Sequence, residues 1–224
     1  VVNKPDNMVT IGKQRCDLQS AIPFILYPPF MQSKARKNIQ HECYLPRPIH
    51  RLDRRTSGCV LVAKSQVAMK KFSKLFATRQ IKKSYCAITF GEPTQQLKND
   101  SSCIKLNGET FYVIDYPIDG KDSITLWRVV LTVKSSTYGT LSLLHLLPKT
   151  GRYHQIRRHL SYCLSCPIVG DIKYDRGSQV AKKARKELSS MFLCSNSIEF
   201  QHVMLKKEHD SDKQKVISIN IPLP

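Results

Sequence analysis

The chain has 224 residues, of which 41% are hydrophobic, so it is long enough to bury the core of one large domain or two small ones. Lysine and arginine number 36 against 17 acidic residues, and the formal net charge of +19 indicates a polyanionic partner, most often a nucleic acid. The sequence shows no transmembrane stretch, no secretory signal and no glycine-rich phosphate loop. The alternative, a solvated basic surface without a partner, is less favoured because the charge also enters the motifs described below.

The first elements predicted along the chain are a strand-like N-terminus, "VVNKP", and an irregular connection over residues 20–48, which contain five prolines. "CVLVA" (59–63) then predicts a short buried strand. Ser65 predicts the N-cap of a helix that ends near Arg79, with an apolar stripe as its buried face. The stripe consists of Val67, Met69, Phe72, Leu75 and Phe76.

Alternating segments dominate the middle of the chain. "KSYCAITF" (83–90) predicts a strand that ends at Gly91. Residues 123–135 and 139–148 are the two strongest strand signals, and the turn near Tyr138 and Gly139 separates them.

The last third of the sequence predicts two helices, one over residues 153–162 and a basic one over residues 180–188. Three short strands, "FLCS", "IEF" and "VISINI", complete the chain. Many strands with a few inserted helices, without regular alternation of strand and helix, predict an α+β fold with a mixed, mainly antiparallel sheet core.

Eight cysteines are spread over the chain, at positions 16, 43, 59, 86, 103, 163, 166 and 194. Several lie in apolar runs, such as Cys194 in "MFLCS", and are expected to be small buried side chains of a reduced compartment. Cys163 and Cys166 form one C-x-x-C, but a zinc ribbon needs a second pair, and none exists. His154 and His159 have no Glu between them, so the zinc-protease helix is absent as well, and we expect no metal site.

One short stretch, "HRLDRRTSG" (50–58), surrounds a single carboxylate with positive charge. An Asp beside arginines is most often a surface ion pair. Here Thr56, Ser57 and Gly58 predict a tight, hydrogen-bonded turn before a buried strand, and the arginines favour the ionised form of Asp53. Asp53 is therefore a candidate nucleophile or base at a site that attracts phosphate.

A second stretch, "LLPKTGRYHQIRRHL" (146–160), runs from a strand end through a Thr-Gly turn into a helix. His154 and Arg157 are three residues apart and are predicted to share a face of that helix. A basic helix lying on a phosphate backbone is the alternative interpretation, notably for Arg152 and Arg158.

Together with Tyr85, which by itself is an ordinary strand tyrosine, these stretches resemble the RluA-type pseudouridine synthases. "HRLDRRTSG" is similar to the family's H-R-L-D motif and "KKSYCAITFG" to its K-x-Y-x-A motif. "LLPKTGRYHQIRRHL" followed by "PIVGDIKYD" is similar to T-G-R-x-H-Q-I-R-x-H-L and P-I-x-G-D. "VVNKP" and "FLCSNSIEFQH" match the first and last family motifs, so the resemblance spans the chain in family order. "HQIRRHL" and "DGKDSITLWRV" favour the TruC-like branch, which acts on tRNA.

The resemblance implies an RNA pseudouridine synthase, an isomerase that flips a uridine out of structured RNA, in tRNA first and in rRNA second. It implies that the catalytic residues are Asp53, which meets the flipped ribose, Tyr85, which stacks on the base, and Arg157, which pairs with Asp53. Arg51 is expected to enter the space left by the base. The other expected substrate-binding residues are His50, Arg54, Arg55, Arg152, His154, Ile156 and Arg158. The implied reaction needs no cofactor and no metal.

The resemblance further implies one catalytic domain over residues 1–224, without a separate RNA-binding domain. RNA is the expected partner, with no membrane contact, and the protein is expected to be a monomer. The chain starts at Val1 rather than Met, and we expect that its natural N-terminus is truncated. We expect an intracellular protein, with the cytoplasm, the nucleus and an organelle such as the mitochondrion all open.

Two hypotheses from other classes stay open at this point. A catalytically silent RNA-binding relative would have lost the Asp, Tyr or Arg of the motifs, and all three are present. A basic Asp/His nuclease would need a cluster of carboxylates for Mg²⁺, and the stretch 50–58 contains Asp53 alone.

Overall fold

The structure, a computed structural model, describes residues 1–12, 16–26, 46–93, 103–201 and 216–223. These residues form two compact units: unit 1 comprises 1–81 and 198–221, and unit 2 comprises 82–197 and 222–224. The sequence predicted one catalytic domain, and this division into two units leaves that a prediction. Cys43, His202 of the last family motif and most of the proline-rich connection lie outside the described residues.

Residues of unit 1 take part in several pairs of strands. β1 (Val2–Lys4) pairs antiparallel with β3 (Ser57–Val60), and β2 (Arg47–Pro48) pairs antiparallel with β4 (Val62–Ala63). β11 (Val216–Asn220) pairs with β10 (Leu193–Gln201), of which residues 198–201 belong to unit 1. The strand predicted over 59–63 is therefore divided at Leu61. The reason is that the Leu61 backbone is bonded to residues 49 and 50: its N–H donates to His50 Nε2 at 3.0 Å, and its carbonyl accepts from Ile49 at 2.9 Å.

The first helix of unit 1, α1 (Leu18–Ile25), corrects the prediction that the irregular connection begins at residue 20. Asp17 caps this helix, since its side chain accepts from the backbone N–H of Ser20 at 2.7 Å. Pro23 lies inside the helix, where it lacks a donor, but Leu18 and Ile22 bury the apolar side. Burial thus outweighs the unfavourable proline in this short helix.

The second helix, α2 (Gln66–Ala77), begins where the sequence predicted, because Ser65 Oγ accepts from the Ala68 N–H at 3.2 Å. Phe72, Leu75 and Phe76 pack against a buried cluster of unit 1. The cluster consists of Cys59, Leu61, Ile81, Ile198 and Phe200. The prediction that the whole apolar stripe is core is wrong: Val67 is 54% exposed, because it lies roughly 140° around the helix from Phe72.

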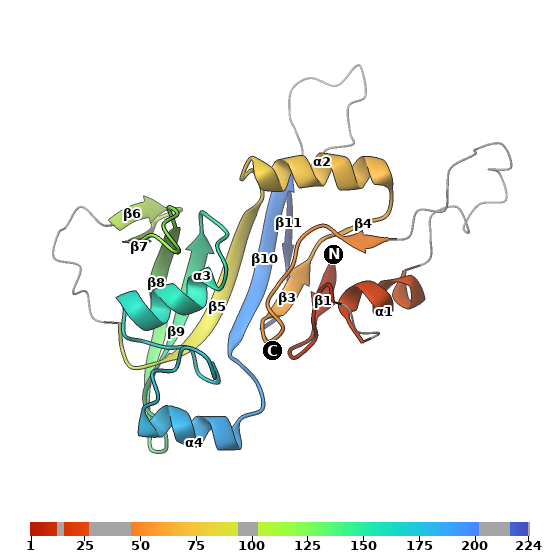
Figure 1. The fold of residues 1–224 in the computed structure, drawn as a ribbon. Coiled ribbons are helices and arrows are strands. Elements are labelled where there is room, and N and C mark those ends of the chain that lie inside the picture. The colour runs from red at the N-terminus through yellow and green to blue at the C-terminus, as the bar shows by residue number, and fades with distance from the viewer. Residues whose placement is uncertain (13–15, 27–45, 94–102, 202–215, 224) are drawn as a thin grey trace, which may run out of the picture. The chain divides into compact units, whose positions relative to one another are not determined.

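Unit 2 is built on an antiparallel meander of neighbouring strands (Figure 1). In spatial order they are β5 (Lys82–Phe90), β9 (Gly139–Pro148), β8 (Ile124–Ser135), β7 (Glu109–Asp115) and β6 (Cys103–Leu106). Tyr85 and Trp127 both lie opposite Leu146, and all three side chains are buried on one face. The hairpin of β6 and β7 was not predicted, although Asn107 and Gly108, both at positive φ, are a recognised hairpin turn.

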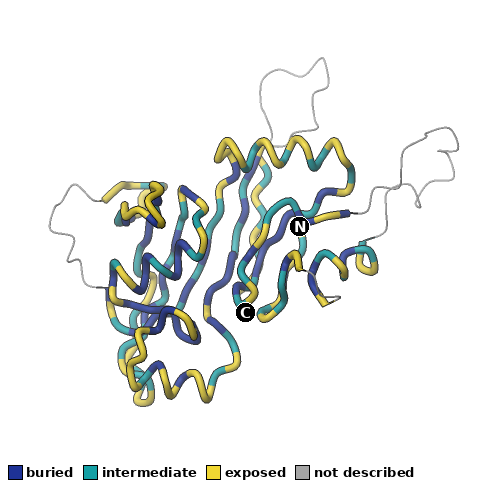
Figure 2. The backbone as a smooth tube through the Cα atoms, viewed as in Figure 1, coloured by how far each residue is buried: buried dark blue, intermediate teal, exposed yellow. Residues whose placement is uncertain are grey.

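The helices of unit 2 follow the meander. α3 (Gln155–Arg158) begins after His154, whose φ is +52°, and continues as a π-helical turn, η3 (His159–Cys163). The helix predicted over residues 153–162 therefore exists, but its hydrogen bonding changes from α-helical to π-helical at His159. α4 (Gln179–Glu187) is capped by Ser178 and packs Ala181 and Ala184 against Phe90 and Val169. Figure 2 shows how exposed most of α4 is otherwise.

The predicted fold class is confirmed: the described strands form a mixed, mainly antiparallel arrangement with inserted helices, an α+β fold. One detail of the prediction is wrong, because "FLCS" and "IEF" belong to the single strand β10. Among the described helices, none combines the length and the apolar character needed to cross a lipid bilayer.

Candidate active site

The loop that contains Asp53 is fixed by hydrogen bonds to the N-terminal segment of unit 1. Thr10 Oγ1 accepts from the backbone N–H of Leu52 at 3.1 Å and donates to the Leu52 carbonyl at 3.0 Å. The N–H of Thr56 donates to the Asp53 carbonyl at 3.1 Å, which closes the predicted turn. Gly58 has φ +118°, a conformation that only glycine adopts easily. The half-buried Asp53 side chain therefore stands on a fixed turn.

Lys4, opposite Gly58 on β1, supports the same loop. Its side chain is fully buried, and its ammonium donates to three backbone carbonyls at 2.8, 2.8 and 3.1 Å. These belong to Pro5, Met8 and Arg54. Burial lowers the pKa of Lys4 to about 8, while the charges of Asp6 and Asp53 act in the opposite direction. The sequence analysis recognised the Lys-Pro pair as part of a family motif. It did not predict that Lys4 is a buried cation that interacts with Asp53.

The other candidates on the loop differ in exposure. Arg51 and Arg54 are exposed and Arg55 is half-buried, and Arg54 Nε donates to the Asn7 carbonyl at 3.3 Å. His50 Nε2 accepts the Leu61 N–H, so this nitrogen belongs to the fold, and the predicted phosphate contact of His50 stays a prediction.

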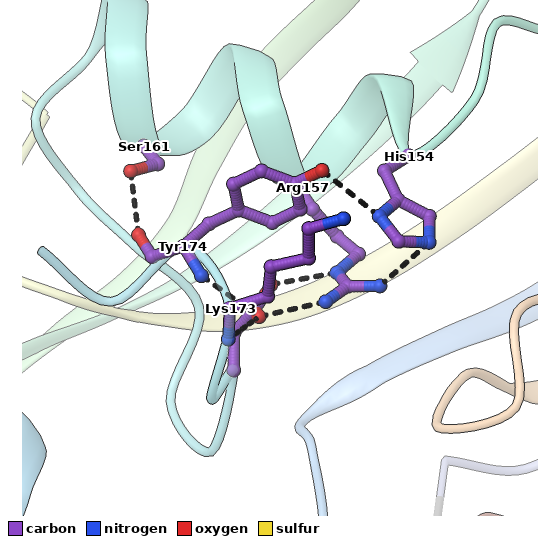
Figure 3. Close-up of polar contacts among 6 residues, drawn as sticks. His154, Arg157, Ser161, Lys173 and Tyr174 are labelled. Atoms are coloured by element: carbon purple, nitrogen blue, oxygen red, sulfur yellow. Dashed lines mark hydrogen bonds and ion pairs between the residues drawn. The ribbon is translucent and has the colours of Figure 1, made fainter.

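Arg157 of unit 2 is buried, with 7% of its surface exposed, and Figure 3 shows its guanidinium near the side chains of His154 and Tyr174. Asp171 binds one edge of this guanidinium. Nε donates to Asp171 Oδ2 at 2.7 Å and Nη2 donates to Oδ1 at 2.8 Å. Oδ1 also accepts the backbone N–H groups of Lys173 at 2.9 Å and Tyr174 at 3.2 Å. This two-bond geometry fixes the plane of the guanidinium.

His154 and Tyr174 hold the same guanidinium from another side. Arg157 Nη1 lies 3.1 Å from His154 Nε2, which confirms that the two residues share a face. Because arginine only donates, Nε2 must accept; the neutral ring then carries its proton on Nδ1 and donates it to the Tyr174 hydroxyl at 3.0 Å. The Tyr174 ring lies 5.0 Å from the guanidinium carbon. Tyr153 stacks on the His154 ring at 3.7 Å.

The remaining candidates of unit 2 have separate partners. Tyr85 is buried on β5, and Ile156 is buried on α3. Arg158 forms a two-bond ion pair with the exposed Asp119, at 2.9 Å for each bond, so it does not share the network of Arg157. Arg152 Nε donates to the Asp122 carbonyl at 3.0 Å.

Sequence reasoning missed three polar residues that position this network. Asp171 and Tyr174 lie in the quoted stretch "PIVGDIKYD", but no role was assigned to either. Gln155 fixes the start of α3, because its Oε1 accepts from Thr150 Oγ1 at 2.7 Å and its Nε2 donates to the Ile124 carbonyl at 2.9 Å. Gln155 and Asp171 occupy positions of the family motifs and Tyr174 lies three residues beyond Asp171, and only the folded chain shows what each one contacts.

The described part of the chain brings together no group of three His, Cys, Asp or Glu side chains that would hold a metal ion. The cysteines within it are all free thiols. Burial raises the pKa of the Cys166 thiol, a member of the C-x-x-C, to about 11.

The structure thus places Asp53 in unit 1, and Tyr85 and Arg157 in unit 2. Within unit 1 it brings Asp53 under the influence of Lys4, and within unit 2 it joins Arg157 to His154, Asp171 and Tyr174. The meeting of Asp53 with Tyr85 and Arg157 stays a prediction.

Residues 1–162 match the family model described as RNA pseudouridylate synthase. The chain is 30% identical over 209 residues to the ribosomal large subunit pseudouridine synthase C of Rickettsia typhi, covering 92% of this chain and 62% of that protein. It is 30% identical over 231 residues to the ribosomal large subunit pseudouridine synthase D of Blochmanniella floridana, covering 100% of this chain and 66% of that protein.

The solved structure of human RNA pseudouridylate synthase domain containing 4 has the same fold, with a TM-score of 0.66 and 23% identity. The match covers 99% of this chain and 84% of the human chain. The chain spans about three fifths of the length of the Rickettsia relative. The family match extends over most of the sequence and includes Asp53, Tyr85 and Arg157, and on this ground the chain belongs to the RNA pseudouridylate synthase family.

Proposed function

We propose that the protein is an RNA pseudouridine synthase that converts a specific uridine in structured RNA to pseudouridine. The observation on which this proposal depends is that the family match, residues 1–162, contains Asp53, Tyr85 and Arg157 at the motif positions. The net charge of +19 fits a polyanionic substrate, and folded RNA as substrate would place the enzyme inside the cell. The catalytic unit is proposed to act as a monomer.

The roles of the three residues follow the family resemblance and fit their surroundings. The target uridine is flipped out of the RNA stack, Arg51 enters the space it leaves, and Asp53 meets the ribose. Arg157 pairs with Asp53 and orients it, while Tyr85 stacks on the base with its phenol toward C5. The rigid mounting of Arg157 on Asp171 and His154 suits this role, because an orienting group must itself be held in place.

The reaction breaks the N1–C1′ bond, turns the uracil and joins it again through C5. The C5 proton is removed, with Tyr85 as the base, and N1 gains a proton, so atoms and electrons balance without a redox partner or water. Asp53 either attacks C1′ or removes the C2′ proton. In both routes it acts as a carboxylate.

The substrate RNA has two candidates. "HQIRRHL" and "DGKDSITLWRV" resemble the TruC-like branch and favour a tRNA, whereas the two bacterial relatives reported above are named for the large ribosomal subunit and favour rRNA. We place tRNA first. His50, Arg54 and Arg55 contact phosphates or shape the loop, and Ile156 gives an apolar wall to the site. Arg152 and Arg158 lie on the phosphate backbone.

Pseudouridine mapping of total RNA tests the proposal. RNA from cells with the gene, without it, and with the Asp53→Asn variant in its place should differ at a small number of uridines. A site present only with the wild-type gene establishes the activity and names the RNA. Identical maps from all three cell lines, together with no product on tRNA or large-subunit rRNA in vitro, would contradict it.

A further inference from the structure

Lys83 is a half-buried lysine to which the mechanism above gives no role. It lies on β5 two residues before Tyr85, so the two side chains project from the same face of the strand. Burial lowers the pKa of Lys83 from its ordinary value, and no opposite charge acts against that shift. Within the described ranges, its Nζ has neither a hydrogen bond nor an ion pair. A lysine in such surroundings is uncommon, because an unpaired ammonium loses hydration without compensation.

The ammonium of Lys83 lies beside the turn that leads into α3. A Cβ atom placed on Gly151 would lie 3.8 Å from Nζ. Gly151 is exposed and has no side chain that could lie between the ammonium and solvent. The same turn continues to His154 and Arg157, which places Lys83 Nζ at the start of the segment that holds the candidate active-site network.

The three arginines of this segment differ from Lys83, because the protein itself supplies their partners. Arg157 is bound by Asp171, Arg158 by Asp119, and the Nε of Arg152 by a backbone carbonyl. An anion that approaches over Gly151 would therefore find one cation that is partly dehydrated and has no internal competitor. Such a group is kept at a cost in stability, which is typical of residues selected for binding rather than for folding.

We propose that Lys83 Nζ binds one phosphate of the RNA substrate beside Gly151. The inference rests on the proposed function for its choice of anion, and it deepens that function by adding a substrate-binding residue outside the predicted set. Bound in this way, the phosphate supplies a negative charge that none of the described residues provides at Nζ, and it anchors the RNA next to the face from which Tyr85 projects.

The test compares Lys83→Met with Lys134→Met, which makes the same change at an exposed lysine of β8 in the same unit. The dissociation constant for bulk tRNA and for large-subunit rRNA is measured over a range of salt concentrations. If the whole interface neutralises roughly six phosphates, the slope of log K against log salt is about −5, by analogy with the relation for DNA. Lys83→Met should weaken binding about tenfold and bring the slope to about −4, and Lys134→Met should leave both unchanged.

Melting curves separate binding from a structural role. Loss of an unpaired, half-buried ammonium should leave the melting temperature of Lys83→Met equal to or above that of the wild type. Gly151→Ala places a methyl group in ordinary contact with Nζ and should weaken RNA binding with an unchanged melting temperature. A lower melting temperature of Lys83→Met with an unchanged salt slope would overturn the inference in favour of a structural lysine.

The outcomes for the inference and for the proposed function are distinct. A wild-type protein that makes no pseudouridine contradicts the proposed function alone, because the salt slopes of binding can still be measured. An active wild type with a Lys83→Met variant of normal affinity and slope overturns the inference alone.

Discussion

The Asp53 loop of unit 1 and the α3 segment of unit 2 hold charges of opposite sign, and the fold supports the two charges in different ways. The loop presents a half-buried carboxylate among cations, and main-chain and hydroxyl contacts through Thr10 and Thr56 hold the turn in place. The α3 segment instead buries a cation, Arg157, and surrounds it with the side chains of Asp171, His154 and Tyr174.

The difference indicates how each charged group is prepared for its proposed task. A carboxylate that must reach a ribose needs accessible oxygens, so the fold fixes its backbone and leaves the side chain half-exposed. A guanidinium that only orients another group needs a fixed plane, so the fold neutralises it with Asp171 and buries the pair. We therefore expect changes in the loop to affect chemistry, and changes at α3 to affect both chemistry and stability.

Asp53→Asn should have the largest effect, a loss of turnover of about 10³-fold or more, because the amide keeps the shape of the side chain but not its charge. RNA affinity and melting temperature should stay close to wild type. Single-turnover assays on the RNA identified by mapping measure the turnover. Filter binding measures the RNA affinity, and thermal melting measures the melting temperature. Turnover within tenfold of wild type would remove Asp53 from its role.

Arg157→Ala should lower turnover by about 10²–10³-fold, because the carboxylate it is proposed to orient loses its position. It should also lower the free energy of unfolding by about 3–5 kcal/mol, since Asp171 would remain buried without its partner. The matched control is Arg158→Ala, which breaks an exposed pair with Asp119 and should change stability little. Urea denaturation measures the free energy of unfolding of both variants. Equal and small losses of stability in the two variants would favour a helix that only contacts phosphate.

Tyr85→Phe should reduce turnover by about 10²-fold with near-normal RNA affinity, because the ring still stacks on the base while the proposed general base is lost. Tyr85→Ala should lose affinity as well as stability, since the side chain is buried on β5. Pre-steady-state rates and binding curves for the two variants separate stacking from proton transfer. A fully active Phe variant would end the claim that the hydroxyl takes part.

The smallest effect is expected from metal removal, where activity in EDTA should equal activity in its absence. The Asp53 loop offers one carboxylate, whereas a magnesium-dependent nuclease needs several oxygen ligands in one place. The assay needs a folded RNA that keeps its structure in monovalent salt, with native gel mobility as the control. RNA cleavage that EDTA abolishes would restore the nuclease hypothesis.

Most of the local structure was predictable because local signals agree with each other. The alternation in β5, β8 and β9 and the Ser65 cap of α2 were read correctly from a few neighbouring residues. The failures lie where long-range contacts override local preference. Pro23 is helical because Leu18 and Ile22 are buried, and residues 59–63 are divided because Leu61 is bonded to Ile49 and His50.

The sequence alone determined the family, the fold class and the choice of Asp53, Tyr85 and Arg157 as candidates, because motif residues and periodicity are written in the order of the chain. Only the tertiary structure decided which groups surround them. The pairing of Arg157 with Asp171, fourteen residues further along, and the burial of Lys4 beneath the Asp53 loop depend on how distant segments are brought together. Periodicity reports which side of an element is apolar. It does not report which polar side chain from another element lies opposite, because that is set by the geometry of the folded chain.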